Sequence, residues 1–148
     1  MFANSYPTSR TAPGSGHNHR VGGLYQQIGV ETRLVSANPH QLVAMLFEGY
    51  MEAVAQARGA LVKGDALVKG QAIGRAVRII EEGLRAGLDL NAGGTLARDL
   101  HELYHYLVMR LTLANLRNDD KLLTECQQLM KPLQEAWLQI ADEPAARR

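Results

Sequence analysis

The sequence has very little cysteine, few aromatic residues and no surplus of charge of either sign. Its single cysteine, Cys126, excludes an intrachain disulfide and a cysteine-rich metal cluster, and is typical of a reducing compartment. Sixteen Lys and Arg residues against fifteen Asp and Glu residues leave no strong field to attract a nucleic-acid backbone or an anionic membrane. We therefore expect neither nucleic acid nor a membrane as a partner.

Long apolar runs are absent as well. No stretch approaches the roughly 18 apolar residues that a membrane-spanning helix needs, and the N-terminus lacks the apolar core of a secretory signal. Hydrophobic residues nevertheless make up 46% of the 148 residues and charged residues 21%, as is usual in a globular domain. The sequence therefore predicts one cytoplasmic domain with one hydrophobic core.

The two ends of the chain differ in composition from its middle. Residues 1–23 are rich in Gly, Pro, Ser, Thr and Asn without apolar periodicity, which predicts a disordered N-terminal tail. Residues 24–141 show the apolar spacing of helices and no alternation typical of strands. Residues 142–148 are expected to form a flexible C-terminal tail. The predicted fold class is all-α.

Capping residues and short breaks divide the middle of the chain into four helices. Asn38, Pro39 and Gln41 have the types expected of an N-cap, a first helical residue and a capping-box partner. The first helix should end at Lys63, before Gly64. The other helices are predicted at about 66–89, 95–117 and 120–140, with Asp65 and Asn118-Asp119 as caps. Because the connections are short, the sequence predicts an antiparallel, up-down-up-down four-helix bundle.

Each predicted helix has an apolar face that should line the core. Cys126 and Tyr104 are interpreted as packed residues rather than as a reactive thiol and a partner contact. The expected core residues are Leu42, Leu46, Gly49, Ala53, Ala57, Ala60; Ile73, Val77, Ile80, Leu84, Leu88; Leu96, Leu100, Leu103, Leu107, Leu111, Ala114, with Ala97, Tyr104 and Val108 beside them; and Leu122, Cys126, Leu129, Leu133, Trp137, Ile140.

Two helices carry more apolar residues than a bundle core requires. Such a second apolar face predicts a docking surface for a helical or extended peptide, for the N-terminal segment of the chain or for a second copy of the chain. The surplus residues are Tyr106, Met109, Leu113 and Leu116 on the third helix, and Val43, Phe47, Tyr50 and Val54 on the first.

The stretch HELYH at 101–105 matches the H-E-x-x-H pattern of zinc peptidases. Its two histidines and its glutamate fall on the polar side of the helix, and Val108 and Leu111 stand where the long form of the motif needs Gly and His. Glu125 has the spacing of a third ligand but lacks the flanking residues. A solvated helix face explains the stretch better than a zinc hydrolase, so no metal or cofactor is expected.

From Tyr25 to Ile140 the sequence resembles the FliS family of flagellin-specific export chaperones. The resemblance implies a cytoplasmic four-helix bundle without enzymatic activity. Such a protein binds the C-terminal segment of flagellin, prevents its premature polymerisation and delivers it to the export gate of the flagellar type III secretion apparatus. The matching stretches are YQQIGVET at 25–32, SANPHQLVAMLFEG at 36–49, GLDLNAGG at 87–94, LYHYLVMRLTLANLRND at 103–119 and EAW at 135–137.

The resemblance also implies which residues contact flagellin. Tyr25 matches the N-terminal tyrosine of the family, and Tyr106, Arg110 and Asn115 match its helix-three pattern. For Asn115 a structural hydrogen bond is an equal alternative. Other flagellar regulators are further candidate partners, and a homo-oligomeric structural bundle, such as a homodimer, is the alternative function. The expected flagellin-binding residues are Tyr25, Ile28, Tyr106, Met109, Arg110, Leu113, Asn115 and Leu116.

Two glycines of the second helix, Gly83 and Gly87, lie near its core side. We expect them to permit close helix approach and to leave room for the backbone of the cargo. On this hypothesis, Gly83→Leu weakens cargo binding while the bundle stays folded.

Overall fold

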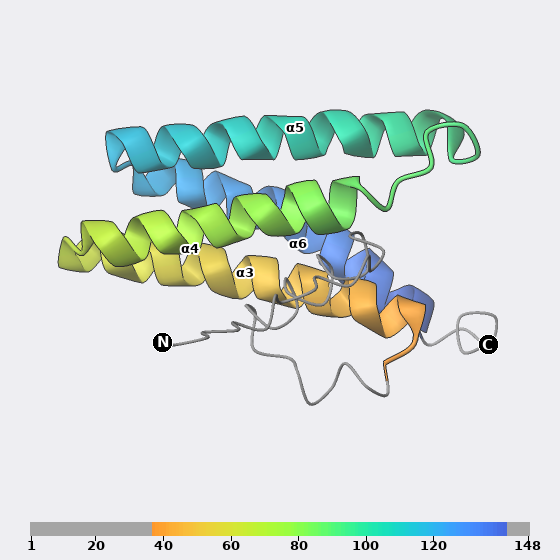
Figure 1. Cartoon of the computed structure of the whole chain (residues 1–148), viewed down its shortest axis with the longest axis horizontal. Coiled ribbons are helices and arrows are strands. Elements are labelled where there is room, and N and C mark those ends of the chain that lie inside the picture. The colour runs from red at the N-terminus through yellow and green to blue at the C-terminus, as the bar shows by residue number, and fades with distance from the viewer. Residues whose placement is uncertain (1–36, 142–148) are drawn as a thin grey trace, which may run out of the picture.

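A computed structural model describes residues 37–141 of the chain, drawn as coloured ribbon in Figure 1. The expectations for residues 1–23 and 142–148, and for Tyr25 and Ile28, lie outside the described residues. Within the described range there are helices and no strand, so the predicted all-α class is confirmed. The elements in order are α3 (Pro39–Lys63), α4 (Ala66–Arg78), η1 (Ile79–Arg85), α5 (Gly94–Arg117) and α6 (Asp120–Ala141).

Capping chemistry explains where the first helices begin and end. Asn38 Oδ1 accepts a hydrogen bond from Gln41 N at 2.8 Å, and Gln41 Oε1 accepts one from Asn38 N at 2.9 Å. Gly64 then ends α3 in the left-handed conformation, with φ 72°, which residues with a Cβ adopt only at a cost. Asp65 begins α4 by accepting a hydrogen bond from Val68 N. The predicted boundaries of the first helix are confirmed.

The second predicted helix, 66–89, is wrong in its last part. The α-helix ends at Arg78, and a wider π-helix, η1, continues to Arg85. A Cβ on Gly83 would lie 2.9 Å from both terminal methyl carbons of Leu46 in α3. The glycine therefore permits the close approach expected of it. A leucine at this position would have to displace Leu46 from the core, so Gly83→Leu is not a clean test of cargo binding.

The four rods, counting α4 and η1 as one, run antiparallel in chain order (Figure 1), and their contacts place them at the corners of a square. α3 packs against α4 and α6, and α5 packs against the same two helices, so α3 and α5 lie at opposite corners. The core is one continuous cluster to which every rod contributes. Its largest fully buried side chains are Tyr50, Val54, Ile79, Ile80, Leu107, Leu111, Leu123, Cys126 and Met130.

Two expectations about apolar faces are wrong. The surplus on the first helix is largely absent, because Phe47, Tyr50 and Val54 are buried where α3 packs against α4, η1 and α6. Leu96 and Ile140, predicted in the core, are 68% and 46% exposed. The core also contains two residues outside the predicted face of the last helix, Leu123 and Met130.

Among residues 37–141, no helix combines the length and the hydropathy needed to cross a membrane.

Candidate partner-binding surfaces

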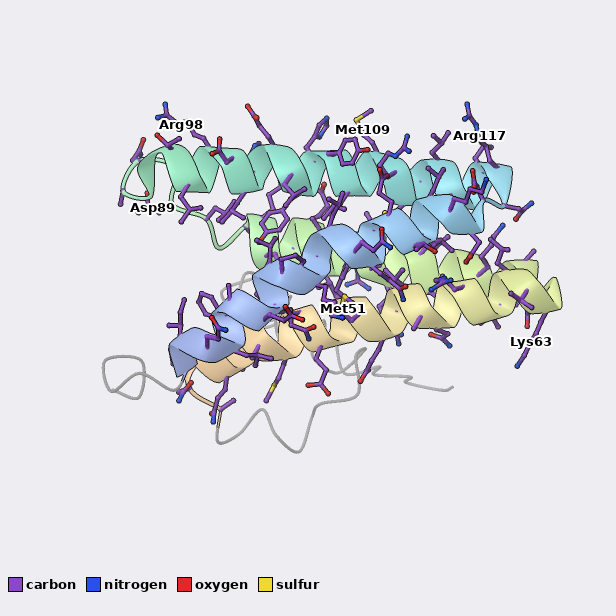
Figure 2. The ribbon with its side chains drawn as sticks, turned by 180° about the vertical axis from the view of Figure 1, so that it is seen from behind. Met51, Lys63, Asp89, Arg98, Met109 and Arg117 are labelled. Atoms are coloured by element: carbon purple, nitrogen blue, oxygen red, sulfur yellow. The ribbon has the colours of Figure 1, made fainter. Side chains whose placement is uncertain are left out.

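α6 changes its neighbours along its length. Figures 1 and 2 both show it beginning beside the end of α5 and finishing beside the start of α3. Pro132, in the second half of α6, supplies no backbone N–H to the helix and so weakens its hydrogen-bond ladder there. Both figures show the second half of α6 diverging from the first half of α5.

An apolar groove of about 350 Å³ lies where the two helices diverge. Within residues 37–141, none of its lining side chains carries a charge, and α3, η1, α5 and α6 all contribute to it. We call it the α5–α6 groove. Such a groove suits the apolar side of a helical or extended peptide. The lining residues are Val43, Phe47, Gly83, Leu84, Gly87, Leu88, Leu96, Leu100, Tyr104, Leu133, Ala136, Trp137 and Ile140.

One wall of the α5–α6 groove is held in place by His40 of α3 and Trp137 of α6. Their rings stack with centroids 4.5 Å apart and 8° between the planes. Trp137 Nε1 donates a hydrogen bond to the His40 carbonyl at 3.0 Å, and His40 Nε2 donates one to the Trp137 carbonyl at 2.9 Å. This reciprocal contact ties the end of α6 to α3, and so keeps α6 away from α5.

The outer side of α5 carries a second candidate surface. Tyr106, Met109 and Leu116 are 41%, 58% and 79% exposed, and Leu113 is half-buried against the core. Met109 points away from the bundle in Figure 2. We call these four residues the outer α5 stripe. They are the surplus residues predicted on this helix, and the structure places three of them at the surface, while Leu113 packs partly against the core.

Arg110 and Tyr106 of this region are held by one carboxylate of α6, Glu125. Tyr106 Oη donates to Glu125 Oε2 at 3.0 Å, and Arg110 Nε donates to Glu125 Oε1 at 2.7 Å. The Arg110 guanidinium carbon also lies 5.6 Å from the centre of the Tyr106 ring, within range of a cation–π contact. The hydrogen bond from Arg110 lowers the pKa of Glu125, and the hydrogen bond to Glu125 raises the pKa of Tyr106. Glu125 thereby fixes the orientation of two predicted binding residues.

Asn115 is exposed, and its backbone carbonyl accepts a hydrogen bond from Lys69 Nζ at 3.0 Å. Lys69 is buried, and its ammonium also donates to Asn118 Oδ1. Asn118 ends α5 in the left-handed conformation, with φ 53°. A buried cation at a helix C-terminus pairs with carbonyls that have no partner within the helix. At Asn115 the main chain therefore has a structural role, while the side chain faces solvent.

Of the five residues of the HELYH stretch, Tyr104 lies in the core, Leu103 packs partly against it, and the other three lie on the polar side of α5. Tyr104 is buried, as predicted, and burial raises its pKa to about 12. His101 Nε2 accepts a hydrogen bond from Arg85 Nε at 3.2 Å, and Glu102 and His105 are exposed. In the part of the chain that the structure describes, no three His, Cys, Asp or Glu side chains gather closely enough to hold a metal ion.

Cys126 is fully buried, which confirms the packed interpretation. Its backbone carbonyl accepts a hydrogen bond from Tyr50 Oη at 2.9 Å. Burial raises the pKa of the thiol to about 12, so the sulfur stays protonated and unreactive at neutral pH.

Spacing alone predicts several groove residues in the core, among them Leu96, Leu133 and Trp137. The spacing is correct for an apolar face, but it does not say where two helices diverge. Pro132 within the last helix is the available signal, because it marks the place where α6 can leave the path of a straight neighbour.

Known proteins resemble the chain over most of its length. The profile of the family described as "Flagellar protein FliS" matches residues 22–144. The flagellar secretion chaperone FliS of Salmonella typhimurium is 47% identical over 117 residues, which cover 79% of this chain and 87% of that protein. The flagellar secretion chaperone FliSB of Pseudomonas aeruginosa is 43% identical over 113 residues, covering 76% and 89%. FliS of Escherichia coli is 40% identical over 121 residues, covering 82% and 89%.

Proposed function

The chain belongs to the FliS family of flagellar secretion chaperones, which are not enzymes, and on this premise we propose that its cargo is the C-terminal segment of flagellin. It binds this segment in the cytoplasm, prevents its premature polymerisation and delivers it to the export gate of the flagellar type III apparatus. The observation that carries the proposal is the uncharged α5–α6 groove.

The α5–α6 groove suits a segment that folds on binding. Its apolar lining offers burial worth roughly 25 cal/mol for each Å² of apolar surface that a partner removes from water. A disordered segment must give up conformational entropy to enter, so the net affinity is smaller than this burial suggests. A chaperone that has to release its cargo at the export gate needs such a balance.

The outer α5 stripe extends the surface available to the same segment. Leu96 in the groove and Leu116 in the stripe are 20 residues apart on α5, a distance of about 30 Å at 1.5 Å per residue. At about 3.6 residues per turn the two side chains also lie on nearly opposite faces of α5, so a segment that contacts both must pass around the helix and needs more than the roughly ten extended residues that cover the axial distance. We expect a cargo segment of this greater length to contact both surfaces, with Tyr106 and Arg110 oriented for it by Glu125.

The first experiment is a calorimetric titration of the full chain with intact flagellin and with flagellin lacking its last few dozen residues. We expect tight binding of the intact form alone. Equal binding of both forms, or of neither, contradicts the proposal. A homo-oligomeric structural bundle then becomes the favoured function, and sedimentation of the free protein would show the oligomer.

Substitutions of two exposed leucines, one in the α5–α6 groove and one outside it, then test where flagellin binds. Leu96 lines the groove and is 68% exposed, so Leu96→Glu should leave the fold intact while placing a charge where apolar cargo docks. We expect it to weaken flagellin binding by about tenfold or more, equivalent to about 1.4 kcal/mol. Leu67→Glu is the matched control, because Leu67 is 71% exposed and does not line the groove. Equal affinity of the two variants would place the cargo elsewhere.

A further inference from the structure

A groove of different chemistry lies between α3 and α4, with a volume of about 590 Å³. Gln56 of α3 and Gln71, Arg75 and Arg78 of α4 supply its polar side chains, and none of the described residues that line it is acidic. We call it the α3–α4 groove. Whereas the α5–α6 groove is apolar and uncharged, this one presents two cations and two amides.

Arg75 has an incomplete set of hydrogen bonds in this groove. Its Nη2 donates to Gln56 Oε1 at 3.0 Å, which orients the guanidinium. Its Nε is buried and has no hydrogen-bond partner among residues 37–141. A buried N–H without an acceptor is unfavourable, above all on a cation, so Arg75 gains if its side chain turns this Nε toward a ligand in the groove; a carboxylate is the acceptor that a guanidinium binds best. Arg78 already pairs with Glu82 at 3.2 Å, so Arg75 is the anchor of the site.

We propose that the α3–α4 groove binds an acidic peptide segment of a partner protein, with one carboxylate of that segment on Arg75. The amides of Gln56 and Gln71 each offer a donor and an acceptor, as a peptide backbone requires. A Cβ on Gly74 would meet no atom of the described residues within 4 Å, so this part of the structure leaves room for a chain beside α4. A free phosphate would use neither the acceptors of the amides nor this room.

A ligand in the α3–α4 groove lies on a different side of the bundle from cargo in the α5–α6 groove. α3 and α4 form one side of the square bundle, and α5 and α6 form the opposite side. Figure 1 shows α4 in front and α6 behind. A partner in the α3–α4 groove therefore leaves the α5–α6 groove accessible, so the chaperone can hold an acidic partner and a second protein at once. This inference is independent of whether flagellin is the cargo.

The test uses the full chain and a short fluorescent peptide of alternating Glu and Ser residues, followed by anisotropy. A second peptide carries Gln in place of every Glu. We expect the acidic peptide to bind and the Gln peptide to bind at least about tenfold more weakly, because a charge-assisted hydrogen bond is lost. Arg75→Gln should reduce the affinity for the acidic peptide by a similar factor. Arg98→Gln removes the same charge from an exposed position on α5 and should have little effect.

A second pair of variants tests the groove without changing charge. Gly74→Leu fills the α3–α4 groove, while Gly70→Leu places the same side chain one turn away, outside its lining. Both positions have open space, and leucine favours a helix over glycine, so thermal unfolding should show that both variants are folded. Only Gly74→Leu should lose the acidic peptide.

Three results would overturn the proposal. The first is equal binding of the acidic and Gln peptides. The second is an equal loss of affinity for Arg75→Gln and Arg98→Gln, which would indicate attraction by charge in general. The third is Arg75-dependent binding of inorganic phosphate that displaces the peptide at the same concentration, which would make the groove a simple anion site.

Discussion

The two ends of the bundle contain similar apolar residues but differ in packing. At the end where α5 passes into α6, which we call the closed end, Leu111, Leu123 and Cys126 are fully buried. At the other, open end, Leu100 and Leu133 are only partly buried and line the α5–α6 groove. The path of α6, rather than the composition of the helices, decides which apolar residues become core and which remain available to a partner.

Polar contacts between helices hold the closed end. Arg58 of α3 forms two hydrogen bonds with Asp120 of α6, at 2.8 and 3.1 Å, and a third with Gln127. The hydrogen bond from Arg58 lowers the pKa of Asp120, so this contact is strongest when the carboxylate is charged. At the open end, His40 and Trp137 join the same two helices. We therefore expect mutations at the closed end to act mainly on stability and mutations at the open end mainly on binding.

The largest effect should come from the core of the closed end. Leu111 is fully buried, so Leu111→Ala leaves a cavity and should lower the free energy of unfolding by about 3 kcal/mol. Leu133→Ala removes the same atoms from a half-buried position in the groove and should cost less than half as much. Chemical denaturation measures both values. Equal losses would show that the two ends are packed alike, which would contradict the difference between the closed end and the open end.

The second effect concerns the contact that holds the groove wall. His40→Ala removes the stacking on Trp137 and one of the two reciprocal hydrogen bonds, and should lower the free energy of unfolding by about 1–2 kcal/mol. Hydrogen exchange should become faster in α6 beyond Pro132 and remain unchanged in the first half of α6. Faster exchange throughout α6 would mean that the two ends unfold as one unit.

Local signals were sufficient to predict most of the helix boundaries. The side chain of Asn38 and the positive φ of Gly64 act within one turn of the chain, so the sequence alone shows where α3 begins and ends. The buried face of α5 follows in the same way from periodicity, with Leu107 and Leu111 at its centre. These predictions depend on neighbours in the sequence, and they are confirmed.

The features that could not be predicted from the sequence depend on residues that are close in space but distant in the chain. The π-helix accompanies the close approach of Gly83 to Leu46, a contact between residues of different helices. Leu96 has the spacing of a core residue, but the divergence of α6 leaves it exposed. Arg75 and Glu125 carry no sequence signal for their roles, because their partners Gln56 and Tyr106 lie on another helix.

A smaller loss of stability should follow from a change in the polar cluster of Tyr106, Arg110 and Glu125. Glu125 has a lowered pKa in the folded chain, below its ordinary value of 4.5, because of the hydrogen bond from Arg110. Its contribution is therefore present at neutral pH and is lost as the pH falls below this ordinary value and through the lowered pKa. Glu125→Gln should lower stability at neutral pH by about 0.5 kcal/mol, because both side chains are partly screened by solvent.

The pH dependence of stability distinguishes the contribution of this cluster from the contributions of the other ion pairs. Between about pH 5 and pH 3, the stability of Glu125→Gln should fall less steeply than that of the unchanged chain. Urea denaturation across this range measures the two slopes. Identical slopes would mean that the contact between Arg110 and Glu125 does not persist in solution, and Tyr106 would then lack its fixed orientation.

The smallest effect on stability should come from Leu116 in the outer α5 stripe, because this exposed side chain has little packing to lose. Leu116 is 79% exposed, so Leu116→Gln should change the free energy of unfolding by less than about 0.5 kcal/mol. If the stripe extends the cargo site, the same variant should weaken flagellin binding several-fold, because cargo would cover this side chain. Val62→Gln is the matched control, since Val62 is 81% exposed at the end of α3. Unchanged cargo affinity in both variants would confine the binding surface to the open end of the bundle, and the exposed leucine of the stripe would need another explanation.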